Sequence, residues 1–310
     1  MNPNTNSKSE NFKAGFVGLI GQPNAGKSTL MNYLIEQKVS IVTSKPQTTR
    51  RRILGIQNTD HAQIVFVDAP GLVKAEKGLN AFLEKEALEV ISESDVLIAV
   101  LSLDEKDQAD IEKVLNLVKE AKRPWMGIVT KTDITEKAHR LMIIKHMVEE
   151  AGGVCHTISA VRQNKEDRAE LLKQIESLLP SAPAPLYDIE LFTTENVRQL
   201  ASEIIREKCF ENLVHEIPYQ IAILVRKFEE DAKPCPKVYV DVIVAKDSHK
   251  AIVIGKKAEL IKKISQESRL EIEKLMQEKI YLELNVVVKN NWFEQNMLMK
   301  ELGYIINDNK

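Results

Sequence analysis

Eight residues near the start of the chain fit the pattern G-x-x-x-x-G-K-S. Glycines in such a loop let backbone N–H groups converge on phosphate oxygens, and the helix that follows adds partial positive charge. Lys27 would supply a cation for the β and γ phosphates, and Ser28 a hydroxyl for Mg²⁺. An apolar run ends at Ile20 and a helical pattern begins at Thr29, so the context favours a phosphate loop over a chance glycine turn. The predicted phosphate-binding residues are Gly21, Gln22, Pro23, Asn24, Ala25, Gly26, Lys27 and Ser28.

Three further polar segments follow apolar runs, at the strand ends where open α/β sheets bind ligands. Asp68 can hold the Mg²⁺ shell, and Gly71 can offer its N–H to a γ phosphate. The carboxylate of Asp133 can accept two N–H bonds from guanine, a donor pair that adenine lacks. Each segment alone is weak, but their order along the chain predicts a guanine nucleotide. The residues predicted to contact it are Asp68, Ala69, Pro70, Gly71, Leu72, Thr130, Lys131, Thr132, Asp133, Ser159 and Ala160.

The elements that must position these residues are visible as apolar runs alternating with helical patterns. One amphipathic stretch, Ile111–Ala121, separates two of the runs. A hairpin is predicted from two runs joined by a turn-rich segment, Ile53–Gln57 and Gln63–Val67. The alternation predicts an α/β fold, a doubly wound mixed sheet covered by helices. The expected strands of the main sheet are Gly15–Ile20, Gln63–Val67, Asp95–Leu101, Met126–Thr130 and Val154–Ile158.

A second, smaller α+β domain is predicted after the proline-rich stretch 180–185, which cannot continue a helix. Its expected order is α-β-β-α-α-β, followed by a terminal helix near Phe293–Leu302. The main expected elements are a helix from Glu195, strands at Gln220–Lys227, Lys237–Val244 and Tyr281–Val288, and a helix at Ala258–Met276. We expect a disordered tail at 1–13, the first domain at 14–183, a linker at 184–194 and the second domain at 195–310.

Composition limits the classes of protein to which the chain can belong. The net charge is −2, so a surface for nucleic acid must be local. The three cysteines show no metal-ligand spacing, which favours reduced thiols in a cytoplasmic protein. The longest apolar run, Val96–Leu101, is far too short to span a bilayer, and we expect no signal peptide in the polar stretch 1–13. Peripheral contact with the cytoplasmic side of the inner membrane stays open.

Positive charge gathers around a glycine turn in the second domain, before a long amphipathic helix. Lysines in such a place are usually a solvated helix face, but the arrangement resembles the turn of a type II KH domain, which implies that it clamps about four nucleotides of a single strand. Trp292, nearby, is expected to pack in the core. The predicted RNA-binding residues are Lys250, Gly255, Lys256, Lys257, Ala258, Lys262 and Lys263.

Together these motifs, with Gln47-Thr48-Thr49-Arg50, resemble the Era family of translation-factor-class GTPases, and the glycine turn resembles that of a type II KH domain. The resemblance covers essentially residues 15–304. It implies a monomeric GTPase that binds GTP and GDP through Mg²⁺, with Ser28, Thr49 and Asp68 as metal residues. It also implies binding of 16S ribosomal RNA near its 3′ end and a role in assembly of the small (30S) ribosomal subunit.

The resemblance implies that Lys27 and Thr49 serve catalysis, with Thr48 as an alternative to Thr49. Leu72 stands where Ras-like enzymes carry a water-orienting glutamine, so no general base is expected and turnover should be slow, on the order of 10⁻⁴ to 10⁻² s⁻¹. Asn24 either holds K⁺, as in related potassium-activated GTPases, or only stabilises the loop.

Two residues depart from the family pattern. Thr130 replaces an asparagine, so some tethering of the loop should be lost. Ala258 replaces the second glycine of the KH turn; it either disfavours a positive φ or simply begins the next helix.

Two other functions compete with a GTPase switch that binds RNA. One is an RNA-binding assembly factor whose hydrolysis is incidental, and the other is a membrane-associated signalling GTPase. The single phosphate loop excludes a double-GTPase assembly factor.

Overall fold

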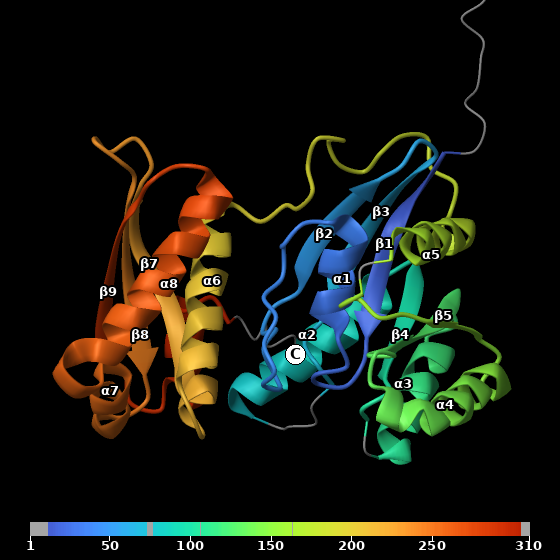
Figure 1. Ribbon diagram of the computed structural model, residues 1–310, viewed down its shortest axis with the longest axis horizontal. Helices are drawn as coiled ribbons and strands as arrows, with labels where there is room; N and C mark the ends of the chain where they lie inside the picture. The colour runs from blue at the N-terminus through green and yellow to red at the C-terminus, as the bar shows by residue number, and fades with distance from the viewer. Residues whose placement is uncertain (1–11, 73–76, 106, 163, 305–310) are drawn as a thin grey trace, which may run out of the picture. The chain divides into compact units, whose positions relative to one another are not determined.

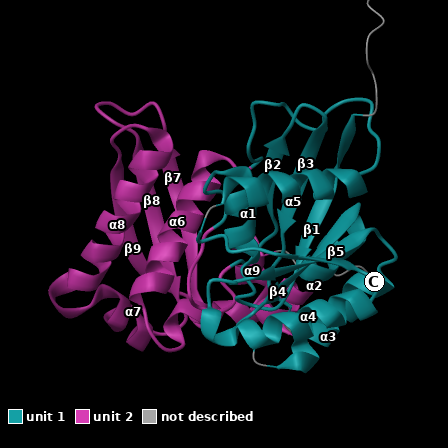
Figure 2. Cartoon of the chain, turned by 45° about the vertical axis from the view of Figure 1, so that its right-hand side comes forward, with its two compact units in different colours: residues 1–40, 49–72, 86–194 teal, residues 41–48, 73–85, 195–310 magenta. Residues whose placement is uncertain are grey.

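The computed structural model describes residues 12–72, 77–105, 107–162 and 164–304. The chain divides into two compact units (Figure 2). Unit 1 comprises residues 1–40, 49–72 and 86–194, and unit 2 comprises residues 41–48, 73–85 and 195–310. The predicted tail at 1–13 falls almost entirely outside the described residues, and the first strand begins at Lys13.

Unit 1 is built on a six-stranded sheet with the order β2-β3-β1-β4-β5-β6 (Figure 1). All neighbouring strands pair in parallel except β2, which runs antiparallel to β3 as the predicted hairpin. The α/β fold with a mixed, doubly wound sheet is therefore confirmed. The strands are β1 Lys13–Ile20, β2 Ile53–Asn58, β3 Ala62–Asp68, β4 Val96–Ser102, β5 Trp125–Thr130 and β6 Val154–Thr157.

Helices cover both faces of this sheet. β3 and β4 are buried at every residue, as expected for strands covered on both sides. Residues of α1 and α5 form one core with β1 and β3, and residues of α2, α3 and α4 form another on the opposite face. The helices are α1 Lys27–Ile35, α2 Gly78–Glu93, α3 Gln108–Glu120, α4 Ala138–Glu150 and α5 Lys165–Leu178, with a short 3-10 turn η1 Thr135–Lys137.

The stretch predicted as a linker lies along unit 1. Ala14 N–H donates to the carbonyl of Pro180, and Gly55 on β2 pairs with Thr193. The Gln63 side chain accepts the N–H groups of Leu186 and Tyr187 at 2.7 and 2.8 Å. The segment from 180 to 194 is therefore anchored by hydrogen bonds to unit 1.

Unit 2 contains a three-stranded sheet with the order β7-β8-β9, in which β7 is antiparallel and β9 parallel to β8. Its order α-β-β-α-α-β agrees with the sequence prediction, and Trp292 is fully buried as expected. The helices are α6 Val197–Asn212, α7 Asp247–Ile254, α8 Glu259–Met276 and α9 Asn296–Glu301; the strands are β7 Ile221–Glu229, β8 Lys237–Val244 and β9 Tyr281–Val288; and the 3-10 turns are η2 Ile217–Gln220, η3 Lys256–Ala258 and η4 Trp292–Glu294.

No helix within the described ranges combines the length and the apolar composition needed to cross a membrane.

Candidate nucleotide site and RNA-binding turn

The phosphate loop lies between β1 and α1. Gly26 immediately before α1 has φ 93°, a left-handed conformation that favours glycine. A Cβ on Gly21 would lie 2.4 Å from the carbonyl oxygen of Val100 on β4, so the loop packs too closely there for any side chain. All eight predicted loop residues are therefore in one strand–loop–helix unit, as the motif requires.

The Lys27 side chain folds back across this loop. Its ammonium group donates to the carbonyls of Gly21 at 3.1 Å and Gln22 at 3.0 Å. Burial lowers the pKa of Lys27 to about 8, and the nearby Asp68 carboxylate only partly offsets that effect. Phosphate groups in the loop would supply the negative charge that this buried cation lacks.

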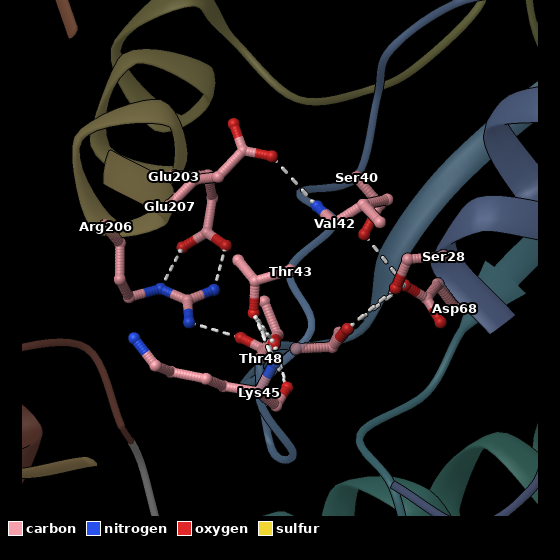
Figure 3. Close-up of polar contacts among 11 residues, drawn as sticks. Ser28, Ser40, Val42, Thr43, Lys45, Thr48, Asp68, Glu203, Arg206 and Glu207 are labelled. Atoms are coloured by element: carbon pink, nitrogen blue, oxygen red, sulfur yellow. Dashed lines mark hydrogen bonds and ion pairs between the residues drawn. The ribbon is translucent and has the colours of Figure 1, made fainter. Parts of the chain in front are cut away.

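A cluster of hydroxyl groups surrounds Asp68 at the end of β3 (Figure 3). Oδ2 of Asp68 accepts hydrogen bonds from Ser28 at 2.5 Å and from Ser40 at 2.8 Å. Thr49 Oγ1 lies 3.3 Å from the same oxygen and 2.9 Å from Ser28 Oγ. Thr48 instead bonds Lys45 and Thr43, so the geometry favours Thr49 over Thr48 as the metal residue.

This cluster fits Mg²⁺. Asp68 Oδ1 is buried and has no hydrogen-bond partner, so one carboxylate oxygen is available to the metal or to its water shell. Burial raises the pKa of Asp68, while Lys27 and the three hydroxyls lower it, and a cation would favour the ionised form further. Mg²⁺ typically takes one or two protein oxygens besides water and phosphate. Among the described residues no three His, Cys, Asp or Glu side chains gather as a metal cage.

The segment after Asp68 lies against the phosphate loop. A Cβ on Gly71 would lie 2.7 Å from both N and Cα of Pro23, so only glycine fits. Leu72 N–H donates to the carbonyl of Gly21 at 3.3 Å. Ala69 is buried and follows β3 directly, with Pro70 next to it. The predicted second motif thus contacts the first.

The two predicted base-binding segments also meet. Ser159 Oγ donates to Asp133 Oδ1 at 2.7 Å, which joins the loops after β5 and β6. Lys131 has φ 59°, and its ammonium lies 3.9 Å from Asp104. Thr132 and Ala160 occupy the same two loops and are half-buried.

Thr130 ties this region to the phosphate loop. Its buried hydroxyl donates to the carbonyl of Ala25 at 2.6 Å, and the carbonyl of Leu101 lies 3.3 Å away. A hydroxyl has one proton, so the shorter bond to Ala25 is the tether. The threonine at this position therefore does connect β5 to the loop.

The glycine turn of unit 2 lies between α7 and α8. Gly255 has φ 73°, and a Cβ there would lie 2.7 Å from the Cβ of Leu260. Ala258 has φ 61° and ψ 24°, so it is left-handed and precedes the helix. The alternative that Ala258 begins α8 is wrong, because α8 starts at Glu259. Five predicted lysines are exposed around this turn: Lys250, Lys256, Lys257, Lys262 and Lys263.

The sequence interpretation missed two groups of residues. Ser40 belongs to the Asp68 cluster, and Asn32 binds the backbone of Ser40, but a serine in a loop carries no recognisable sequence signature. The segment 41–48 belongs to unit 2, where Val42 N–H donates to the buried Glu207 at 3.0 Å and Arg206 donates to the carbonyl of Thr48 (Figure 3). Those partners are more than 150 residues apart in sequence.

Comparison with known proteins agrees with both parts of this description. A family model described as 50S ribosome-binding GTPase matches residues 16–131, and a KH domain model matches residues 216–293. GTPase Era from Chromobacterium violaceum is 40% identical, covering 94% of this chain and 98% of the relative. GTPase Era from Geotalea daltonii is 35% identical, covering 95% and 99%.

Two solved structures resemble the whole chain. One is an Era variant from Aquifex aeolicus bound to GDP·AlF4⁻, with a TM-score of 0.88, 30% identity, and coverage of 95% of this chain and 100% of that chain. The other is Era in complex with MgGDPNP and nucleotides 1506–1542 of 16S ribosomal RNA, with the same TM-score and coverage and 31% identity. Because it matches both a GTPase model and a KH domain model, and is 35% and 40% identical to the two GTPase Era relatives named above over almost its full length, this chain belongs to the Era family and is a GTP-hydrolysing enzyme.

Proposed function

We propose that this GTPase binds 16S ribosomal RNA near its 3′ end and acts in assembly of the small ribosomal subunit. The observation that carries the proposal is the similarity along nearly the whole chain, both domains included, to Era solved with MgGDPNP and a 16S ribosomal RNA segment. The proposed domains are a GTPase domain at 14–183, a linker at 184–194 and an RNA-binding KH domain at 195–310.

The RNA would bind at the turn between α7 and α8. The backbone at Gly255 packs closely against Leu260, and the exposed Lys256 and Lys257 follow it in the turn. Such a turn contacts the sugar-phosphate backbone of about four nucleotides, while neighbouring elements read the bases. Lys250 on α7, with Lys262 and Lys263 on α8, would add contacts to phosphates.

The test measures binding of a short RNA with the 3′-end sequence of 16S ribosomal RNA, with a GTP analogue or GDP bound. Lys257→Glu removes a charge-assisted bond and adds repulsion, so its affinity should fall about tenfold or more. Lys274→Glu changes a lysine whose side chain is 79% exposed, at the far end of α8, and serves as the control. Equal affinities for both variants would contradict the proposed RNA site. As a GTPase switch, the chain should bind the RNA differently with GTP and with GDP. Identical crosslinks to ribosomal RNA in both nucleotide states would contradict such control by the nucleotide.

The proposed nucleotide contacts are the loop residues 21–28, the segment 68–72, the base loop 130–133 and the pair 159–160. Ser28, Thr49 and Asp68 would hold Mg²⁺, which neutralises charge on the phosphates. Asp133 would accept the two guanine N–H donors, and Ser159 at 2.7 Å fixes its orientation.

Hydrolysis would proceed without a side-chain base. Leu72, at the position after Gly71, offers no group that could orient or deprotonate a water molecule. Lys27 and the loop N–H groups stabilise charge on the phosphate oxygens, and Thr49 helps to fix their geometry. The intrinsic rate should therefore stay on the order of 10⁻⁴ to 10⁻² s⁻¹.

Asn24, in the phosphate loop with φ 64°, would help to hold a K⁺ ion near the phosphates. If so, hydrolysis is faster in potassium than in sodium buffer, and Asn24→Ala abolishes that difference. Equal rates for the unaltered protein in the two buffers would leave Asn24 as a loop-stabilising residue only.

We further propose a monomer that acts in the cytoplasm, with peripheral membrane contact as a secondary property. Flotation with anionic lipid vesicles in the absence of RNA tests that contact. A variant at Lys27 that lacks hydrolysis but still supports subunit maturation would favour the alternative of an assembly factor with incidental GTPase activity.

A further inference from the structure

Three hydroxyl groups share one oxygen of Asp68, and one of them differs from the other two. Ser28 is half-buried at the start of α1, and Thr49 is a predicted Mg²⁺ residue. Ser40 is fully buried, as Asp68 is, and it is not among the proposed metal or nucleotide contacts. Its hydroxyl is nevertheless 2.8 Å from Asp68 Oδ2 (Figure 3). Ser40 therefore contacts the proposed metal site through Asp68.

The side chain of Asn32 forms hydrogen bonds with both the N–H and the carbonyl group of Ser40. Asn32 Oδ1 accepts the N–H groups of Val39 and Ser40, each at 2.9 Å. Asn32 Nδ2 donates to the carbonyl of Ser40 at 2.6 Å. Asn32 lies on α1 one turn after Ser28, so the same helix that carries a metal hydroxyl also fixes Ser40.

Ser40 also stands at a boundary of the chain. Residues 41–48 belong to unit 2, and the chain returns to unit 1 at Thr49. The two residues that border this excursion within unit 1, Ser40 and Thr49, both reach Asp68 Oδ2. Of these two residues, Ser40 is the one whose backbone is hydrogen-bonded by Asn32.

We propose that Ser40, fixed by Asn32, is a positioning residue that orients the Asp68 carboxylate for Mg²⁺. It binds Oδ2 and leaves Oδ1, the oxygen without a hydrogen-bond partner, for the metal shell. This proposal rests on the magnesium site proposed above. Because Ser40 acts through the carboxylate and not through the γ phosphate, its effect is the same with GDP and with GTP. Residues that orient metal ligands in this way typically change metal affinity by about 10–100-fold when they are lost.

The test measures the Mg²⁺ concentration that gives half-maximal retention of a fluorescent GDP or GTP analogue by the full-length chain. Ser40→Ala should raise that concentration about tenfold with either nucleotide. Ser94→Ala is the matched control, because Ser94 is a buried serine of the same unit that donates to the carbonyl of Val90 at 2.7 Å, away from the site. It should leave the Mg²⁺ requirement unchanged.

Two further variants separate positioning from general damage. Ser40→Cys keeps the size of the side chain but is a weaker donor, so it should fall between the original chain and Ser40→Ala, and it carries the test if Ser40→Ala does not fold. In a chain that already carries Asp68→Ala, adding Ser40→Ala should not raise the Mg²⁺ requirement any further. The proposal would be overturned if Ser40→Ala had the same Mg²⁺ requirement as Ser94→Ala. It would also be overturned if Ser40→Ala raised the requirement as much in the Asp68→Ala chain as in the original one. Nucleotide retention that needs no Mg²⁺ in the unaltered chain would instead refute the magnesium site.

Discussion

Thr130 shows how a single hydroxyl can connect two loops of the nucleotide site. Its bond of 2.6 Å to the Ala25 carbonyl is buried, and Thr130→Val would keep the shape of the side chain while removing the donor. The free energy of GDP binding should weaken by about 0.5–1.5 kcal/mol, which is roughly a two- to thirteenfold loss of affinity. Dissociation of fluorescent GDP measures this, and Thr130→Ser should behave as the unaltered chain. If valine and serine gave equal rates, the tether would have no part in binding.

Lys27 makes nucleotide binding depend on pH. Burial lowers its pKa to about 8 in the nucleotide-free chain, and bound phosphates raise that pKa because they favour the ammonium form. Binding should therefore take up a proton above about pH 8, and the affinity for GDP should fall there by at most about tenfold per pH unit. Below that pH the lysine is already charged, and the affinity should be flat.

Calorimetry of GDP binding in buffers of different ionisation enthalpy measures the proton uptake. We expect about 0.9 proton near pH 9 and little near pH 7. Lys27→Ala should remove the uptake even if its binding is weaker. Equal uptake at both pH values would show that another group titrates.

Two residues of the turn between α7 and α8, Lys257 with φ 47° and Ala258 with φ 61°, are in the left-handed conformation. Ala258 has φ 61°, which costs an L-residue with a Cβ about 1–2 kcal/mol. Ala258→Gly removes that cost. Glycine also gives the unfolded chain more conformational freedom, which lowers the free energy of unfolding by about 0.4–1 kcal/mol. The net result should be a small gain in the free energy of unfolding, at most about 1.5 kcal/mol.

Ala251→Gly is the matched control, because Ala251 is exposed within the neighbouring α7. There glycine should destabilise by about 0.5–1 kcal/mol. Urea unfolding of the full chain distinguishes the two variants by the sign of the change. A loss of stability in both would mean that the strain at Ala258 is already relieved by its surroundings.

The elements that carry the motifs could be predicted because their signals are local. β8 Lys237–Val244 and β9 Tyr281–Val288 have the predicted bounds, and the phosphate loop lies in the predicted strand–loop–helix context. The roles of Ser40 and of the segment 41–48 could not be predicted. Lys45, for example, donates to the carbonyl of Leu213 at 2.6 Å across 168 residues of sequence. No local periodicity encodes such a pair.

At the scale of the whole molecule, the two compact units are not two successive stretches of the sequence. Residues 73–85 precede more than half of unit 1 in the chain but belong to unit 2. Leu79, Phe82 and Leu83 share a buried cluster with Trp292 and Tyr304. The rings of Phe82 and Tyr304 lie 5.6 Å apart in an edge-to-face arrangement. Unit 2 therefore needs the first part of α2 to complete this cluster.

Phe82→Ala should accordingly destabilise unit 2, by about 3–5 kcal/mol, because it opens a cavity in that cluster. The chain has two tryptophans, and replacing Trp125 of unit 1 by Phe leaves Trp292 fluorescence as a reporter of unit 2. In that background the urea midpoint of Phe82→Ala should fall. Leu88→Ala, on the same helix but 48% exposed, should cost less than about 0.5 kcal/mol. An unchanged midpoint for Phe82→Ala would mean that the 195–310 segment completes its core without α2.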